Sequence, residues 1–308
     1  MGSLRDEVRA PLSAHLAIGA AQLGFGLFPV VGKLAFPPRG PFPPFAVAAL
    51  RAAFGAASLF LLAEVVKAPR IERRSDYGRL AVYAFFGIVL NQILYLKGLD
   101  LSSATHAGLL AAATPAVAYL LAIVVRRERP RLQPSVGVLL AVLGAAWVVL
   151  LRPVVPGQAP TRLGDALLFA NQACYAVYLV FVRDVLERVD PLRAIAWIFV
   201  FGAIANVPIG LKEALEVPWA SISRADAWHL AFILVFPTSL GYALNAYALK
   251  RAPATLAAIY TSSQPVFATI GAAWILGERA SVPETVGATA LILVGVTLVA
   301  LRRVGSTP

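Results

Sequence analysis

The sequence predicts an all-α integral membrane protein with ten transmembrane helices in two inverted five-helix repeats. Three observations lead to this prediction. Hydrophobic residues make up 59% of the 308-residue chain, charged residues only 14%, and the mean hydropathy is +0.76, which excludes an ordinary soluble domain. The charges are clustered and leave long uncharged stretches between them. The second half of the chain also repeats the first at a constant offset of 150 residues.

Ten stretches are long enough to cross the hydrocarbon core, which takes about 17 to 25 helical residues. They cover 10–32, 40–63, 80–96, 101–125, 132–151, 166–182, 194–211, 227–249, 252–277 and 285–301. Only the second of them contains a charged residue, Arg51. The connections between them are too short for a domain outside the membrane, so we expect one compact helical bundle.

The repeat is recognised from residue types that this composition does not readily match by chance. The offset pairs, without a gap, Gln22 with Gln172, Pro41 with Pro191, Phe86 with Phe236, Thr105 with Thr255, Pro115 with Pro265, Glu128-Arg129 with Glu278-Arg279, and Gly137 with Gly287. We therefore expect repeats over 1–150 and 151–308. Because five spans are an odd number, the second repeat enters the membrane from the opposite side. Inverted repeats of this kind are typical of secondary transporters.

Lys and Arg are distributed unevenly between the two sides of the predicted bundle. With the N-terminus in the cytoplasm, eighteen of them fall on the cytoplasmic side and eight on the other. The positive-inside rule then predicts a multi-pass protein of the inner (plasma) membrane with both termini in the cytoplasm. Since topology explains the net charge of +11, we expect the lipid bilayer and a small-molecule substrate as partners, and no nucleic acid.

The acidic residues and histidines are expected at or near helix ends. His15, His106 and His229 share no metal-ligand spacing, and Cys174 is the only cysteine, so neither a metal nor another cofactor is expected. Each histidine is predicted to be interfacial. No Asp or Glu lies in the middle of a predicted span, so we expect transport to follow the substrate gradient without a proton-binding group.

Both halves carry motifs that resemble a known family. The first contains Tyr95-Leu-Lys-Gly-Leu-Asp-Leu-Ser-Ser-Ala-Thr-His, Thr114-Pro115, Arg127-Glu128-Arg129, Gly137 and Gly144; the second contains Tyr247-Ala-Leu-Lys-Arg-Ala-Pro-Ala-Thr255, Gln264-Pro265, Leu276-Gly277-Glu278-Arg279, Gly287 and Gly295. Each set resembles an EamA domain, although the first half has Arg127 where the family usually has a Gly before the Glu. Tandem EamA domains resemble the ten-helix carriers of the drug/metabolite transporter superfamily, which export amino acids, aromatic compounds, sugars, nucleotide sugars and other metabolites.

Polar and aromatic residues inside the predicted spans are the candidates for substrate binding, because such polar groups usually face the bundle interior or a water-filled path. They share helix faces that recur at the offset of 150. The candidates are Gln22, Phe25, Arg51, Asn91, Tyr95, Gln172, Tyr175, Tyr178, Tyr242, Asn245, Tyr260 and Gln264. The alternative for the amides and aromatics is ordinary packing between helices.

Three residues have a sharper alternative. Arg51 suits a carboxylate or phosphate, but from about two turns inside its helix it could also reach the outer interface or the end of a neighbouring helix. Pro115 and Pro265 are expected to act as hinges, because a proline inside a helix removes one backbone hydrogen bond. A static kink is the alternative for both.

These features predict a transporter, not an enzyme. We expect it to export a small metabolite by alternating access: an amino acid, with aromatic amino acids among the candidates, or a related amphipathic compound. The alternative cargo is a phosphate-bearing metabolite or nucleotide sugar, which would need several cations near the midplane, where only Arg51 is found. An intramembrane enzyme would need a catalytic pair or metal cluster at depth, and a channel would need a filter or charged ring. A monomer and a homodimer both remain open.

Overall fold

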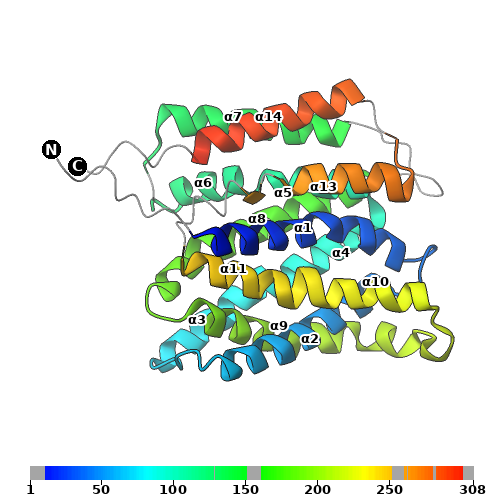
Figure 1. Ribbon diagram of the computed structural model, residues 1–308. Helices are drawn as coiled ribbons and strands as arrows, with labels where there is room; N and C mark the ends of the chain where they lie inside the picture. The colour runs from blue at the N-terminus through cyan, green and yellow to red at the C-terminus, as the bar shows by residue number, and fades with distance from the viewer. Residues whose placement is uncertain are drawn as a thin grey trace.

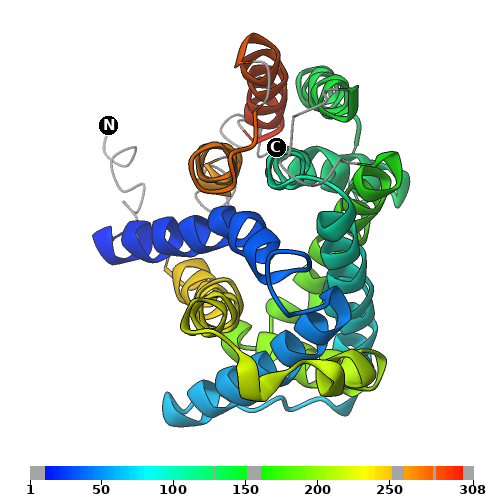
Figure 2. The same ribbon diagram turned by 90° about the vertical axis from the view of Figure 1, so that its right-hand side faces the viewer.

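The computed structural model describes residues 11–127, 129–150, 161–251, 260–261, 263–279 and 282–300. Over these residues the chain forms helices and no β-strand, and the long helices lie side by side (Figure 1). In both views α7 and α14 lie at one edge of the bundle and α2 and α3 at the other, with α1 between them (Figures 1 and 2).

The two halves have matching elements. The first half contains α1 (Leu12–Ala35), α2 (Pro44–Val65), α3 (Arg74–Ala84), the π-helix η1 (Phe85–Leu90), α4 (Asn91–Leu101), α5 (Ala104–Ala112), α6 (Thr114–Val124) and α7 (Leu132–Leu150). The second half contains α8 (Arg162–Leu186), α9 (Pro191–Glu216), the short η2 (Trp219–Ser221), α10 (Arg224–Leu234), the π-helix η3 (Val235–Leu240), α11 (Gly241–Leu249), α13 (Gln264–Gly271), the π-helix η4 (Ala272–Leu276) and α14 (Val282–Ala300). Six of these elements begin 150 residues after their counterpart, and η1 and η3 also end 150 residues apart.

Six helices are long and apolar enough to cross a membrane: α1, α2, α8, α9 and the continuous helices Arg74–Leu101 and Arg224–Ala248. A seventh span forms if α5 and α6, which are bent by 43° at their break, are counted together. Three further apolar helices, Leu132–Trp147, Gln264–Leu276 and Thr285–Val299, are shorter. The all-helical membrane fold is therefore confirmed, while the total of ten spans stays a prediction.

Local sequence explains where several helices begin and bend. Thr161 and Ser103 accept backbone N–H bonds of 3.0 Å from Gly164 and His106, and so cap the first turns of α8 and α5. The break between α5 and α6 falls at Ala113, two residues before Pro115, where the proline ring prevents a continuous helix.

Contacts between the halves obey the same offset. The helix α2 packs on α9 and α7 on α14, so each of these helices meets its own counterpart, and α5 packs on α13, the counterpart of the helix α6 that follows it. Other pairs are matched when the two halves are exchanged: α4 with α8 corresponds to α11 with α1, and α6 with α8 corresponds to α13 with α1.

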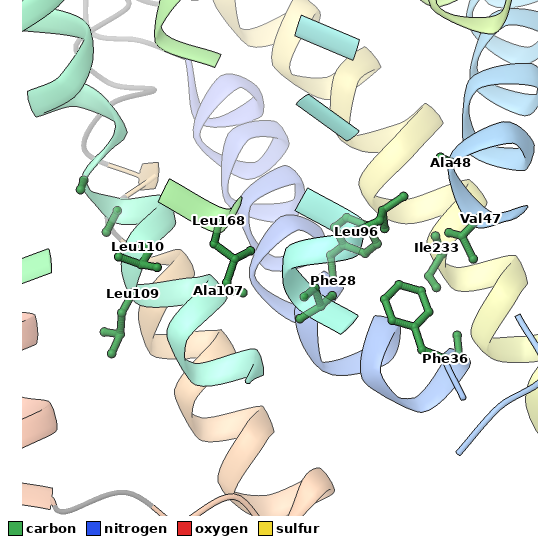
Figure 3. Packing of buried hydrophobic residues seen from close by; sticks show 14 of the residues in the cluster. Phe28, Phe36, Val47, Ala48, Leu96, Ala107, Leu109, Leu110, Leu168 and Ile233 are labelled. Carbon is green, nitrogen blue, oxygen red and sulfur yellow. The ribbon is translucent and has the colours of Figure 1, made fainter. Parts of the chain in front are cut away.

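A large cluster of buried apolar side chains surrounds the C-terminal part of α1. Phe28, Phe36, Leu96, Leu168 and Ile233 belong to it, contributed by α1, α4, α8 and α10 (Figure 3). Phe36, Leu96, Leu168 and Ile233 are almost completely buried. The bundle is therefore closely packed around the C-terminal part of α1.

Candidate functional site

A cavity of about 950 Å³ lies between the two halves, within the range of small-molecule binding sites. Residues of α1, α2, α4, α5, α6, α8, α9, α11 and α13 line it. It brings together eleven of the twelve predicted binding residues: Gln22, Phe25, Arg51, Asn91, Tyr95, Gln172, Tyr175, Tyr178, Tyr242, Asn245 and Gln264.

Tyr260 is the exception. Its hydroxyl group lies 3.1 Å from Nδ1 of His15, and its ring packs edge-on against that imidazole. It is not among the residues that line the cavity. Its part in substrate binding stays a prediction.

Two glutamines bridge the halves in equivalent ways. Gln264, at the start of α13, donates from Nε2 to Oε1 of Gln22 on α1 at 2.5 Å. In the counterpart, Thr114 at the start of α6 donates from Oγ1 to Oε1 of Gln172 on α8, also at 2.5 Å. Each glutamine thus bonds the residue just before the proline of the other half, which links both bent helices to the cavity wall.

Arg51 is buried at the cavity wall. Its side chain is 4% exposed, its Nε donates to Oγ1 of Thr238 at 2.9 Å, and its guanidinium carbon lies 4.2 Å from the ring centre of Phe28. The side chain therefore points into the bundle and does not reach for the outer interface. The bond to Thr238 uses only Nε, and within the described residues the two η nitrogens make no hydrogen bond, so they remain available to a carboxylate in the cavity.

Aromatic rings surround this cation. Phe28 stacks on Tyr95 with ring centres 5.1 Å apart, and Tyr175 stacks on Tyr178 at 5.6 Å. Phe25 meets Tyr242 edge-on at 5.6 Å. These rings give the cavity flat apolar walls that suit the apolar or aromatic part of a ligand.

One end of the cavity is open. Its lining follows α8 from Asn171 to Glu187, a distance of about 24 Å along a helix. At this mouth Arg127 donates two hydrogen bonds of 2.7 Å to the carboxylate of Asp184. This bond raises the pKa of Arg127 further above its ordinary value, so the guanidinium at the mouth stays charged.

The other end of the cavity is closed by polar contacts within the first half and between the halves. Lys33 at the end of α1 donates from Nζ to three carbonyl groups at and just after the end of α4, those of Leu99, Asp100 and Ser102, at 3.0 to 3.1 Å. Glu278 accepts the backbone N–H groups of Ala104 and Thr105 at 2.9 and 3.1 Å, and the hydroxyl of Thr105 at 2.7 Å. We call this region, with His106 and Asp165, the sealed end.

His106 and Asp165 lie near helix ends, as the sequence predicts, but they are buried inside the bundle. Both side chains are fully buried, with His106 Nδ1 2.8 Å from Asp165 Oδ1. Asp165 does lie in the first turn of α8, as its position suggested. The connection between α4 and α5 covers that turn and excludes water from it.

Several residues at the cavity were missed by the sequence-based selection. Asn171 donates to the carbonyl of Asn91 at 2.8 Å and accepts from Gln172 at 2.7 Å. Gln92 is 2% exposed, and neither of its amide atoms has a partner among the described residues. Gln92 is adjacent in sequence to the selected Asn91, and Asn171 to the selected Gln172. This adjacency is the feature of the sequence that could have identified them.

The two prolines differ in their surroundings. Pro115 lines the cavity directly after the break between α5 and α6, whereas Pro265 is buried at the second position of α13. Their role as hinges stays a prediction. Within the described residues, no group of three or more His, Cys, Asp or Glu side chains could hold a metal ion.

Comparisons with known proteins agree with this architecture. Residues 12–150 and 162–301 each match the EamA-like transporter family. The chain is 25% identical to the uncharacterized transporter YetK of Bacillus subtilis over 92% of this chain and 86% of that one. It is 23% identical to a WAT1-related protein of Arabidopsis thaliana, over 71% and 65% of the two chains.

A solved structure shows the same fold. A crystal structure aligns with 96% of this chain and 99% of its own, with a TM-score of 0.62 and 20% sequence identity. Since the family match covers nearly the whole chain in two copies, the chain belongs to the EamA-like transporter family and is a membrane transporter.

Proposed function

We propose that this transporter exports an amino acid, or a related amphipathic carboxylate, by alternating access between two inverted five-helix repeats. The repeats span 1–150 and 151–308, and the protein lies in the inner (plasma) membrane with both termini in the cytoplasm. The exchange symmetry of the helix contacts and the matched element starts support this arrangement.

The observation that carries the proposal is the chemistry around Arg51. Of the cations that line the cavity, Arg51 alone comes from a buried position beside aromatic rings. Arg127 and Arg183 line the mouth, where Arg127 is already bonded to Asp184. A single guanidinium near apolar walls suits a monocarboxylate with an apolar side chain, whereas a nucleotide sugar would call for several cations at depth.

The difference between the two ends supports alternating access. Lys33 and Arg183 are repeat counterparts, yet Lys33 is held by carbonyl groups at the sealed end and Arg183 lines the open mouth. With the predicted topology, the mouth faces the cytoplasm and the sealed end faces outward. This is the state in which an exporter takes up its cargo.

Counterflow in proteoliposomes tests the proposed substrate class. Liposomes that contain the purified transporter and an excess of unlabelled phenylalanine, tyrosine or leucine should accumulate the same labelled amino acid. The matched methyl esters and decarboxylated amines should fail to drive counterflow, because they lack the carboxylate that Arg51 would hold. Counterflow by a nucleotide sugar and not by any amino acid would contradict the proposal.

A further inference from the structure

We propose that His106 and Asp165 form a proton-binding site that couples opening of the sealed end to the pH outside the membrane, an inference that rests on the transport cycle proposed above. The pair joins the two halves, since His106 lies on α5 and Asp165 on α8. It departs from the expectation that no proton-binding group takes part in transport.

The bonding pattern leaves one position for an extra proton. Oδ1 of Asp165 accepts hydrogen bonds from Ser102 Oγ at 2.5 Å and from His106 Nδ1 at 2.8 Å, as an ionised carboxylate does. A neutral imidazole protonated at Nδ1 has a free lone pair on Nε2 that can accept a proton. That atom is buried and has no hydrogen-bond partner among the described residues, so a proton can bind there without breaking a contact.

Oδ2 of Asp165 is also buried without a partner in the described part of the chain. Half of the carboxylate is therefore buried and makes no hydrogen bond to the described residues while the end is sealed. A buried anion in this condition is unfavourable unless a positive charge lies next to it. An imidazolium at His106 supplies that charge at 2.8 Å.

The other charged groups near the pair do not neutralise it. Lys33 donates to three carbonyl groups, which fits an ammonium group with three protons. Glu278 is bonded to the first turn of α5, the helix that carries His106. With Asp165 and Glu278 negative and Lys33 positive, the buried groups sum to one negative charge, which a proton on His106 cancels.

The remaining charges in this region face solvent. Asp100 pairs with the exposed Lys97 at 2.8 Å, and Arg39 and Arg162 are exposed. Water and salt screen these charges, so they contribute little to the net charge of the buried groups at the sealed end. Closing the end therefore takes up a proton, and opening it, which hydrates both side chains, releases one. Acid outside the membrane favours the sealed form.

Cysteine labelling from outside measures this opening directly. In a Cys174→Ala background, Ala104→Cys places a thiol at a fully buried position of the sealed end, and Ser221→Cys places one at an exposed position on the same predicted side. Intact cells are treated with an impermeant maleimide at outside pH values between about 5.5 and 7. The ratio of the labelling rates at the two sites removes the pH dependence of the thiol reaction itself.

The ratio should rise with pH, by up to about tenfold per pH unit, which is the limit for one proton. His106→Gln and Asp165→Asn, made separately so that a folding defect in one leaves the other, should each give a ratio that no longer changes with pH. His229→Gln is the matched control, because His229 lies on the same side near Asp226 but outside the sealed end. It should keep the pH dependence.

The outcomes separate this inference from the proposed function. A ratio that is independent of pH in the unmodified background, or a pH dependence that survives both substitutions, overturns the proton site and leaves the carrier mechanism intact. Absence of labelling at Ala104→Cys at every pH would overturn both, since the sealed end would then never open.

Discussion

Replacing Arg51 is the most direct test of how the cavity holds its ligand. Arg51→Gln removes the charge but keeps a side chain that can still reach Thr238, the partner of Nε at 2.9 Å. Arg51→Lys keeps the charge but removes the forked donor that binds a carboxylate through two nitrogens. Both variants leave the aromatic walls of the cavity in place.

The expected magnitude follows from the bonds that Arg51 has left to make. Its η nitrogens face the cavity without a partner in the described residues, and hydrogen bonds to a charged group are each worth about 1.5–3 kcal/mol net. Loss of this interaction in Arg51→Gln should raise KM for an amino acid about ten- to hundredfold. Arg51→Lys should fall between Arg51→Gln and the parent.

Counterflow kinetics with paired substrates provide the assay. The loss should be large for the amino acid, whereas its methyl ester, which lacks the carboxylate, should fail to drive counterflow in the parent and in both variants alike. Arg193→Lys is the matched control. Arg193 is only 3% exposed and donates to the carbonyl of Ala68 at 2.8 Å, but it does not line the cavity. It should lower thermal stability and leave KM unchanged. An Arg51→Gln variant with normal KM for the amino acid would refute the carboxylate assignment.

Two further predictions concern the cavity wall and the topology. Gln172→Ala, which removes the bond to Thr114, should reduce transport several-fold in protein that is still folded, whereas Leu143→Ala on the exposed face of α7 should not; equal transport in both variants would place the binding site elsewhere. With Cys174→Ala, a cysteine at Ser75 should be shielded from an impermeant thiol reagent added to intact cells, and the reverse result would invert the orientation.

The sequence was sufficient to predict the cavity because helical periodicity and the repeat act together. Gln22 and Gln172 are polar groups inside apolar helices at equivalent positions, and both line the cavity. Tyr260 had no such support: its repeat counterpart, Leu110, is fully buried in the apolar cluster. Arg51 also lacks a polar counterpart, since position 201 is Phe, yet it lines the cavity, so the repeat supports a candidate but does not select every one.

The sealed end could not be predicted in the same way. His106 and Asp165 are 59 residues apart, and Glu278 reaches Thr105 across 173 residues. Neither pair has a local sequence pattern, because each contact exists only once the two halves have packed together. A position near a helix end predicts exposure. At the start of α8, however, the connection between α4 and α5 covers the helix end and buries Asp165.

The π-helical segments η1 and η3 fix the direction in which the helices that follow them point. The segments η1 and η3 end directly before α4 and α11, which carry Asn91, Tyr95, Tyr242 and Asn245 into the cavity. Each α-helical residue turns the chain by about 100°, so deletion of a single residue within Phe85–Leu90 would swing Asn91 and Tyr95 away from the cavity together. The wide turns thus act as spacers that keep both binding faces in phase, and a one-residue deletion there should abolish transport more completely than any single substitution on those faces.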